Sequence, residues 1–199
     1  MHLKFRILSF WQVGSGAGSM GTFDSRAARD PDGLPVIPGR QVKGLCRQAV
    51  HEAEAMQLPG VPDGTANRLF GTRLPLQSRG RDRGRSSSAD EDPLPGVLRF
   101  SDAQLPEVTR SALIGQPGRI AALYSSVRST SMTEKGIARP HSLRFDEVVI
   151  PLDMMAEVAP LGPGAGDWQT AIRAALPMLN AIGSGRTRGL GRVIVTLEG

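Results

Sequence analysis

Three acidic residues, Asp24, Asp30 and Asp32, lie in a stretch where a carboxylate can take part in chemistry. Asp30 precedes a proline and Asp32 precedes a glycine. Both dipeptides are typical of turns, in which the aspartate binds nearby backbone. Asp24 has no such turn role. Arg26 and Arg29 follow it closely, so its carboxylate indicates either a chemical role among phosphate-binding arginines or a local ion pair.

Histidine and cysteine chemistry finds little support in the sequence. His2, His51 and His141 are far apart, and no two of them have the spacing of metal ligands. Cys46 is the only cysteine, which excludes a disulfide within the chain and any site built from several cysteines. The sequence also lacks the GxSxG motif of a serine nucleophile elbow.

The first glycine-rich stretch, Gly14–Gly21, contains a literal GxGxxG after an expected strand. In a dinucleotide-binding fold a helix would open there, with an acidic residue about 20 positions further on. Here several prolines and glycines follow instead, and the Gly-Lys-Ser/Thr of a P-loop is missing. Two interpretations stay open: a flexible loop, or a backbone that another backbone approaches closely.

The second glycine-rich stretch, Gly183–Gly191, predicts more about function. Arg186, Arg188 and Arg192 alternate with small residues directly after an expected helix. Glycines let successive backbone amides face outward, and the arginines add positive charge, so the stretch fits a phosphodiester chain. The alternative is a long turn whose arginines are only solvated.

The charge balance agrees with phosphate recognition. The chain has 199 residues, a formal net charge of +5, and lysine only at Lys4, Lys43 and Lys135. The guanidinium group of arginine pairs two phosphate oxygens at once, which suits a phosphate-binding surface. A GC-rich genome would produce the same arginine bias, so the positions of the arginines must carry the argument.

Composition and length predict the general class of protein. A hydrophobic fraction of 40% and a charged fraction of 22% are typical of a globular chain, and the length predicts one domain over residues 1–199. No apolar run approaches the roughly 18 residues that span a membrane, and the first residues lack the apolar core of a signal peptide. We therefore expect a cytoplasmic protein with no membrane partner.

Hydrophobic periodicity predicts the elements that position these residues. We expect strands at 3–13, 97–101, 145–158 and 192–197, and helices at 40–57 and 167–182. This order suits an α+β, ferredoxin-like domain, a split βαβ with an antiparallel sheet and two helices on one face.

Two segments fit no regular element. Residues 72–95 carry a basic block, three serines and an acidic block, which predicts a flexible, solvated insertion. Residues 130–143 are polar and irregular and lie between apolar stretches, which predicts an exposed hairpin or arm.

At this point several motifs together resemble a known family. The run Ile37–Arg47 (IPGRQVKGLCR) resembles the "IPG–SLKG–R" signature of the RAMP superfamily of CRISPR-associated proteins. Leu69–Gly71 matches its "LFG" turn, and Gly183–Gly191 resembles its C-terminal glycine-rich loop. Gly21–Asp24, followed by Arg29–Pro31, resembles the active-site loop of the repeating backbone subunit of type III effector complexes. The sequence departs from the signature where Arg and Gln replace serines after the IPG.

The resemblance implies an RNA-recognition-motif-like fold with insertions, in which residues 130–143 form a thumb-like hairpin. It implies several copies packed head to tail along a CRISPR RNA whose backbone they bind. The further partners would be a complementary target RNA and other effector subunits, including a large polymerase-like subunit. The expected RNA-binding residues are Lys43, Arg47, Arg128, Arg186 and Arg188.

The resemblance also implies a chemical role for Asp24, which matches the aspartate that the family uses to cleave target RNA with a divalent metal, usually Mg²⁺. Asp24 would hold the metal or help to deprotonate the 2′-hydroxyl that attacks the adjacent phosphate. Two alternatives stay open: a non-catalytic RNA-binding scaffold or capping subunit, and an RNA-processing endonuclease in which His51 would be the general base.

Overall fold

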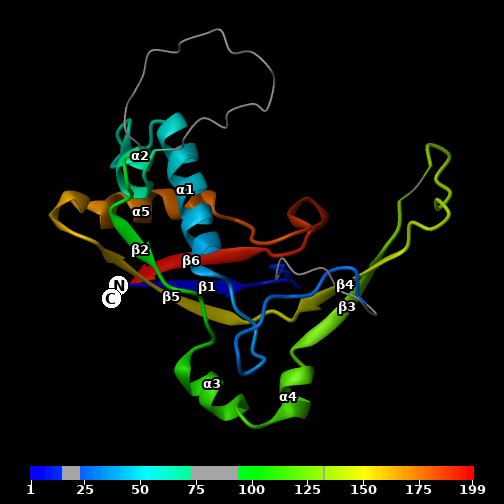
Figure 1. Ribbon diagram of the computed structural model, residues 1–199. Coiled ribbons are helices and arrows are strands. Elements are labelled where there is room, and N and C mark those ends of the chain that lie inside the picture. The colour runs from blue at the N-terminus through cyan, green and yellow to red at the C-terminus, as the bar shows by residue number, and fades with distance from the viewer. Residues whose placement is uncertain (15–22, 73–93, 132) are drawn as a thin grey trace, which may run out of the picture.

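The computed structural model describes residues 1–14, 23–72, 94–131 and 133–199, and its centre is a four-stranded antiparallel sheet (Figure 1). The strand order is β2-β5-β1-β6, with all neighbours antiparallel. The strands are β1 (His2–Ile7), β2 (Leu98–Phe100), β5 (Asp153–Pro160) and β6 (Val193–Glu198). The connection from β1 to β2 and the connection from β5 to β6 both lie on one face of the sheet.

Helices α1 (Gly39–Ala55) and α5 (Trp168–Ala175) make these two crossings and cover that face (Figure 1). The buried positions of α1 recur every three or four residues, as in an amphipathic helix: Gly39, Val42, Cys46, Ala49, Val50 and Ala53. Asp102 caps α1 from outside the helix, because its Oδ1 accepts from the Gly39 N–H at 2.6 Å. Burial raises the pKa of the Cys46 thiol to about 12, so Cys46 is an inert core residue.

Asp167 caps the start of α5 with its side chain. Asp167 Oδ1 accepts a hydrogen bond from the Thr170 N–H at 3.2 Å, and the hydrogen bonds from Thr170 lower the pKa of Asp167. The helix is shorter than the predicted 167–182, because Pro177 lacks an N–H and a 3₁₀ turn (Leu176–Met178) replaces the last turns.

The opposite face of the sheet is open. In β1, Leu3, Phe5 and Ile7 point to the core, whereas His2, Lys4 and Arg6 alternate with them on the open face. The neighbouring positions on this face include Asp153 and Glu157 of β5, Thr196 and Glu198 of β6 and Arg99 of β2. The described strands place no Phe, Tyr or Trp side chain there.

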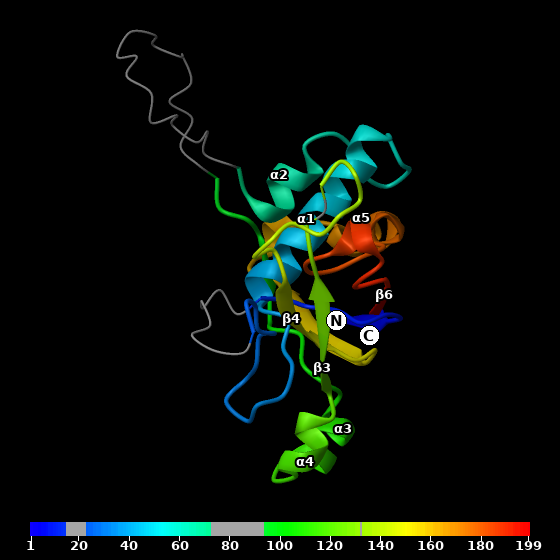
Figure 2. The same ribbon diagram turned by 90° about the vertical axis from the view of Figure 1, so that its right-hand side faces the viewer.

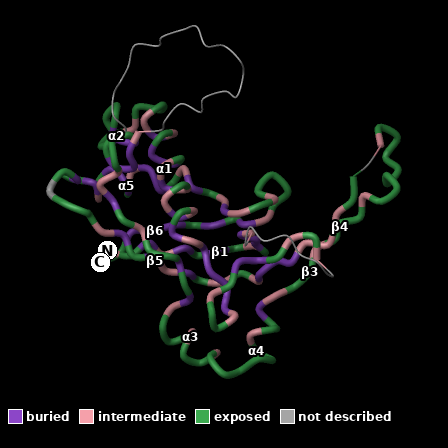
Figure 3. Tube along the Cα trace, viewed as in Figure 1, coloured by how far each residue is buried: buried purple, intermediate pink, exposed green. Residues whose placement is uncertain are grey.

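A second, two-stranded ribbon projects away from the sheet (Figures 1 and 2). It pairs β3 (Tyr124–Ser129) with β4 (Arg144–Val149), and residues 130–131 and 133–143 form the described part of its end. Trp11, in the segment that follows β1, joins the ribbon to the body through backbone hydrogen bonds with Val149. The described part of the end is almost wholly exposed (Figure 3).

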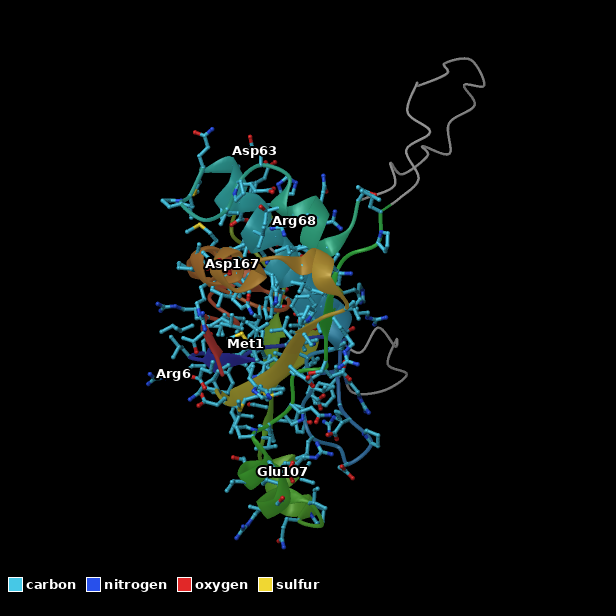
Figure 4. The ribbon with its side chains drawn as sticks, turned by 90° about the vertical axis from the view of Figure 1, so that its left-hand side faces the viewer. Met1, Arg6, Asp63, Arg68, Glu107 and Asp167 are labelled. Carbon is cyan, nitrogen blue, oxygen red and sulfur yellow. The ribbon has the colours of Figure 1, made fainter. Side chains whose placement is uncertain are left out.

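Three short helices complete the described part. Helix α2 (Thr65–Phe70) packs on α1, where Glu54 Oε1 accepts from the Ala66 N–H at 2.8 Å. Helices α3 (Glu107–Leu113) and α4 (Pro117–Ala121) contain no buried residue. Figure 4 shows Glu107 of α3 at the opposite end of the molecule from Arg68 of α2 and Asp167.

The helix at 40–57 and the strands at 97–101 and 192–197 are confirmed to within two residues at either end. The first strand ends at Ile7 rather than residue 13, and the apolar stretch 145–158 divides into β4 and β5. Of the expected insertion 72–95, residues 73–93 lie outside the described residues.

Candidate nucleic-acid interface

The glycine-rich loop 183–191 requires glycine at both of its ends. Gly183 has φ +73°, and a Cβ there would lie 2.0 Å from the carbonyl oxygen of Gln12. Gly191 has φ +70°, and a Cβ there would lie 2.0 Å from the carbonyl oxygen of Ile182. Glycine alone tolerates this combination of left-handed backbone and close approach. The loop is thereby closed against the segment that follows β1.

A groove of about 520 Å³ lies between this loop and the N-terminal half of α1. Arg40 stands on the helix wall and Arg186 on the loop wall. Gly44 lies on the floor at mid-helix, and a Cβ there would meet nothing within 4 Å. A glycine inside a helix costs about 1 kcal/mol relative to alanine, so open space at that position favours a ligand that approaches closely. The remaining lining residues are Val13, Gly14, Gln41, Leu45, Gln48, Gly183 and Ser184.

The structure brings only some of the expected RNA-binding residues together. Arg186 and Arg188 are exposed in a 3₁₀ turn of the loop (Arg186–Arg188), and Arg186 lines the groove. Lys43 and Arg47 are half-buried on α1 and are not among the groove's lining residues. Arg128 is on β3, with its guanidinium carbon 5.4 Å from the centre of the Phe145 ring.

Sequence reasoning missed Arg40 as a groove residue, because it entered only as a departure from the family signature. A signal was present in the spacing of Arg40, Gly44 and Gln48, which are four residues apart and therefore share one helix face. This face is exposed at all three positions.

Asp24 lies beside Phe145 of β4, near the end of the ribbon's paired strands that is farther from the Trp11–Val149 junction with the body. Its N–H donates to the carbonyl oxygen of Phe145 at 2.9 Å, and its Oδ2 accepts from the Phe145 N–H at 2.8 Å. The residue is exposed. Strand β4 therefore fixes the position of the carboxylate and leaves it accessible from solvent.

Arg29, one of the two arginines left open as ion-pair partners of Asp24, binds a different acid. Arg29 Nη2 lies 2.7 Å from Oε1 of Glu147, and its guanidinium carbon lies 3.6 Å from the centre of the Tyr124 ring. Glu147 is a buried acid that also accepts from the Ala27 N–H at 3.1 Å. Burial raises the pKa of Tyr124 to about 12, so this phenol stays neutral and donates to the Gly33 carbonyl oxygen at 2.7 Å.

The turn roles of the other two loop aspartates are confirmed. Asp30 Oδ1 accepts from the N–H groups of Asp32 and Leu34, at 2.9 and 3.0 Å, and its Oδ2 binds Arg110 of α3. Asp32 binds the same guanidinium group. The hydrogen bond to Asp30 raises the pKa of Arg110. Both Asp30 oxygens are thus occupied, which removes Asp30 as a second candidate for chemistry.

The donor set around Asp24 fits a magnesium ion only if RNA supplies further ligands. Among the described residues, no group of three or more His, Cys, Asp or Glu side chains could hold a metal ion. Magnesium normally keeps several waters and binds through one or two carboxylates together with phosphate oxygens. Asp24 meets that pattern as an exposed, positioned carboxylate.

The fold and the groove define a class of α+β protein with an antiparallel sheet, two helices on one face and a basic groove beside a glycine-rich loop. A family model described as RAMP superfamily matches residues 4–194, and the chain therefore belongs to the RAMP superfamily. No helix in the described ranges is long and apolar enough to cross a membrane.

Two solved structures show the same fold. A chain of the type III-B Cmr-beta structure in the apo state is 13% identical, with a TM-score of 0.59, and 98% of this chain matches 95% of that one. A chain of type III-B Cmr-beta bound to cognate target RNA is 11% identical, with a TM-score of 0.65 and the same coverage. No curated protein matches the sequence.

Proposed function

We propose that the chain is a CRISPR RNA-binding subunit of a type III effector complex. Membership of the RAMP superfamily supports this, and both similar structures are type III-B Cmr-beta complexes, one of them bound to cognate target RNA. The observation that carries the proposal is the groove, which Arg40 of α1 and Arg186 of the glycine-rich loop both line together with Gly44 and Gly183. Two guanidinium groups and a close-approach surface suit a phosphodiester backbone, whatever its sequence.

The strand order also supports a ferredoxin-like domain of the RNA-recognition-motif kind. That motif usually binds RNA by stacking bases on aromatic residues of its open sheet face. Here the described open face carries no Phe, Tyr or Trp; its residues are charged, polar or aliphatic, with Ile194 among the aliphatic ones. We therefore expect RNA to bind the loops at the strand ends, and base pairing between guide and target to supply the sequence specificity.

In the assembly, further copies of the chain follow one another head to tail along the guide, because a heterologous interface that does not close forms a filament. The ribbon β3–β4 is the thumb, and its end reaches the duplex of guide and target RNA. Four basic residues, Arg128, Lys135, Arg139 and Arg144, outnumber the three acids of the ribbon, Glu134, Asp146 and Glu147. Other effector subunits, including a large polymerase-like subunit, would bind beyond this filament.

The second part of the proposal is cleavage of the paired target RNA at Asp24. The 2′-hydroxyl oxygen attacks the adjacent phosphorus, the bond from phosphorus to the 5′-oxygen breaks, and that oxygen leaves with a proton. The products are a 2′,3′-cyclic phosphate and a 5′-hydroxyl. Asp24 accepts the 2′-hydroxyl proton or orients the metal, and a bound Mg²⁺ would neutralise charge on the phosphate.

One observation favours the alternative of a non-catalytic scaffold or capping subunit. The carboxylate of Asp24 already accepts the Phe145 N–H, so its presence has a structural reason. The two functions differ in what an amide at this position does. Asparagine keeps an oxygen that can accept the same hydrogen bond but removes the charge.

The test uses the complex assembled on a guide RNA, with labelled complementary RNA as substrate. We expect cutting with Mg²⁺, no cutting with chelator, and a loss of at least a hundredfold in rate for both Asp24→Asn and Asp24→Ala at unchanged RNA affinity. Cutting of Asp24→Asn at the wild-type rate, or no cutting by the wild-type complex, would establish the scaffold. Metal-independent cutting of guide-precursor RNA would establish the processing enzyme instead.

A further inference from the structure

Gln12 is a buried polar residue between two segments that the proposed function uses. Only 4% of its surface is exposed. Its Nε2 donates to Ser25 Oγ at 2.7 Å, and its Oε1 accepts from Ser184 Oγ at 2.6 Å. Its backbone oxygen also accepts from the Ser184 N–H at 2.8 Å. One side chain thus joins the glycine-rich loop to the residue that follows Asp24.

The chemistry of this position calls for an amide. The side chain must donate at one branch and accept at the other, and glutamine has both groups at its end. A buried amide is costly unless its groups are bonded, and here both branches are. A hydrophobic residue of the same size would cost less free energy to bury, so the presence of an amide indicates that it holds its neighbours in position.

The other side of Ser25 is held by β4. The Glu147 N–H donates to the Ser25 carbonyl oxygen at 2.9 Å, next to the pair of hydrogen bonds between Asp24 and Phe145. Within the described residues, Gln12 makes the only hydrogen bonds that connect loop 183–191 with the segment 23–29 through a side chain. A displacement of the loop can therefore reach the residue beside Asp24 through this amide, in addition to the backbone path in which the Val13 carbonyl oxygen accepts from the Ala28 N–H at 2.7 Å.

We propose that Gln12 is a positioning residue for target cleavage, which couples the guide-binding loop to the Asp24–Ser25 segment. This inference rests on the proposed function. Guide phosphates seated beside Ser184 and Arg186 fix the loop, the loop fixes the amide of Gln12, and the amide fixes Ser25. The carboxylate next to it is then held where the target RNA lies across the guide.

The test compares single-turnover cleavage at saturating target RNA with guide affinity. Gln12→Met keeps the length of the side chain and removes both hydrogen bonds. We expect the cleavage rate to fall about 10- to 100-fold, the effect of a misplaced catalytic group, with guide and target affinities unchanged. Ser25→Ala lowers the rate in the same way, and the double variant is no slower than the slower single variant, because both break one chain of contacts.

Ser101→Ala is the matched control. It removes a serine hydroxyl that accepts from the Glu157 N–H at 2.8 Å, at the far edge of the sheet, and it should cut at the wild-type rate. Wild-type cutting by Gln12→Met, or multiplicative losses in the double variant, would overturn the coupling while Asp24 still carried the cleavage. A wild-type complex that does not cut would overturn the proposed function as well. If Gln12→Met does not fold, Ser25→Ala and Ser184→Ala decide, since each removes one end of the same link.

Discussion

The two segments that border the proposed RNA path are held in place by opposite means. Loop 183–191 is held by the absence of side chains, since a Cβ at Gly183 or Gly191 would lie 2.0 Å from a carbonyl oxygen. Segment 23–35 is held by side chains that reach partners far along the sequence, such as Arg29 to Glu147. Loop 183–191 should therefore be destabilised by substitutions that add atoms, and segment 23–35 by substitutions that remove them.

Gly183→Ala should have the largest effect. The substitution adds a Cβ to a residue at φ +73° and directs it at the Gln12 backbone. We expect a loss in the free energy of unfolding on the order of 3 kcal/mol, because left-handed strain and overpacking each cost about 1–3 kcal/mol. Chemical denaturation measures it. Gly189→Ala, at φ +84° but with open space around its Cβ, is the control and should lose only the strain. Equal losses would mean that the contact with Gln12 is irrelevant.

Glu147→Ala tests the second segment and should come next. The change leaves the buried Ala27 N–H without its acceptor and takes the carboxylate from Arg29. An unsatisfied buried donor costs about 1–3 kcal/mol, so we expect a loss of about 2 kcal/mol. Glu134→Ala, at an exposed position in the ribbon's end, should leave the stability unchanged. A thermal melt in which the two variants coincide would show that segment 23–35 is held by backbone alone.

The sequence predicts the parts of this comparison that depend on local pattern. Helix α1 is correct to within two residues because its apolar positions repeat every three or four residues over more than four turns. The Asp30 turn is also local, since its side chain binds backbone two and four residues on. Close approach of another backbone to a glycine is found in the second glycine-rich stretch, at Gly183. The first stretch, for which the sequence left this interpretation open beside that of a flexible loop, lies outside the described residues from residue 15 onward.

What escapes prediction depends on contacts between distant residues. Glu147 follows a second acid, Asp146, in β4, so nothing local shows that it is buried, and its partner Arg29 is 118 residues away. Gln12 joins residues 13 and 172 positions distant. Helices α3 and α4 bury no residue, so no apolar stripe marks them in the sequence.

Substitution of the arginines in the groove should have a smaller effect, which is measured as affinity for guide RNA. Arg40→Ala with Arg186→Ala removes the two arginines that line the groove. We expect about tenfold weaker guide binding and a fall of about 1.4 in the slope of log affinity against log salt, at about 0.7 per phosphate contact for a single strand. Filter binding across salt concentrations measures both. Replacing the same two arginines by lysine should restore most of the slope.

Lys43→Ala sharpens the same experiment. Sequence reasoning made Lys43 an RNA-binding residue, whereas the structure places it half-buried beside the core face of α1 and outside the groove lining. If Lys43→Ala reduces the salt slope by as much as either groove arginine alone, the RNA path extends beyond the groove onto the other side of α1.

The end of the ribbon should show the smallest effect on stability. Its hydrogen bonds are made within the end itself, as between Thr133 and Ile137 and between Ser131 and Arg139. Ile137 is 65% exposed, so little apolar area is lost with it. Replacing residues 133–140 by two glycines should therefore leave the melting temperature within about 1 °C, far below the shift of several degrees that 1 kcal/mol produces in a small domain.

Guide affinity of this shortened ribbon should also change little, while the spacing of cuts along the target becomes irregular if the end reaches the duplex. The ribbon shortened in this way contrasts with both segments above, because it is held neither by close backbone contact nor by long-range side-chain pairs. A variant that unfolds would show that the end packs into the body, and regular cutting by a folded variant would remove it from the thumb role.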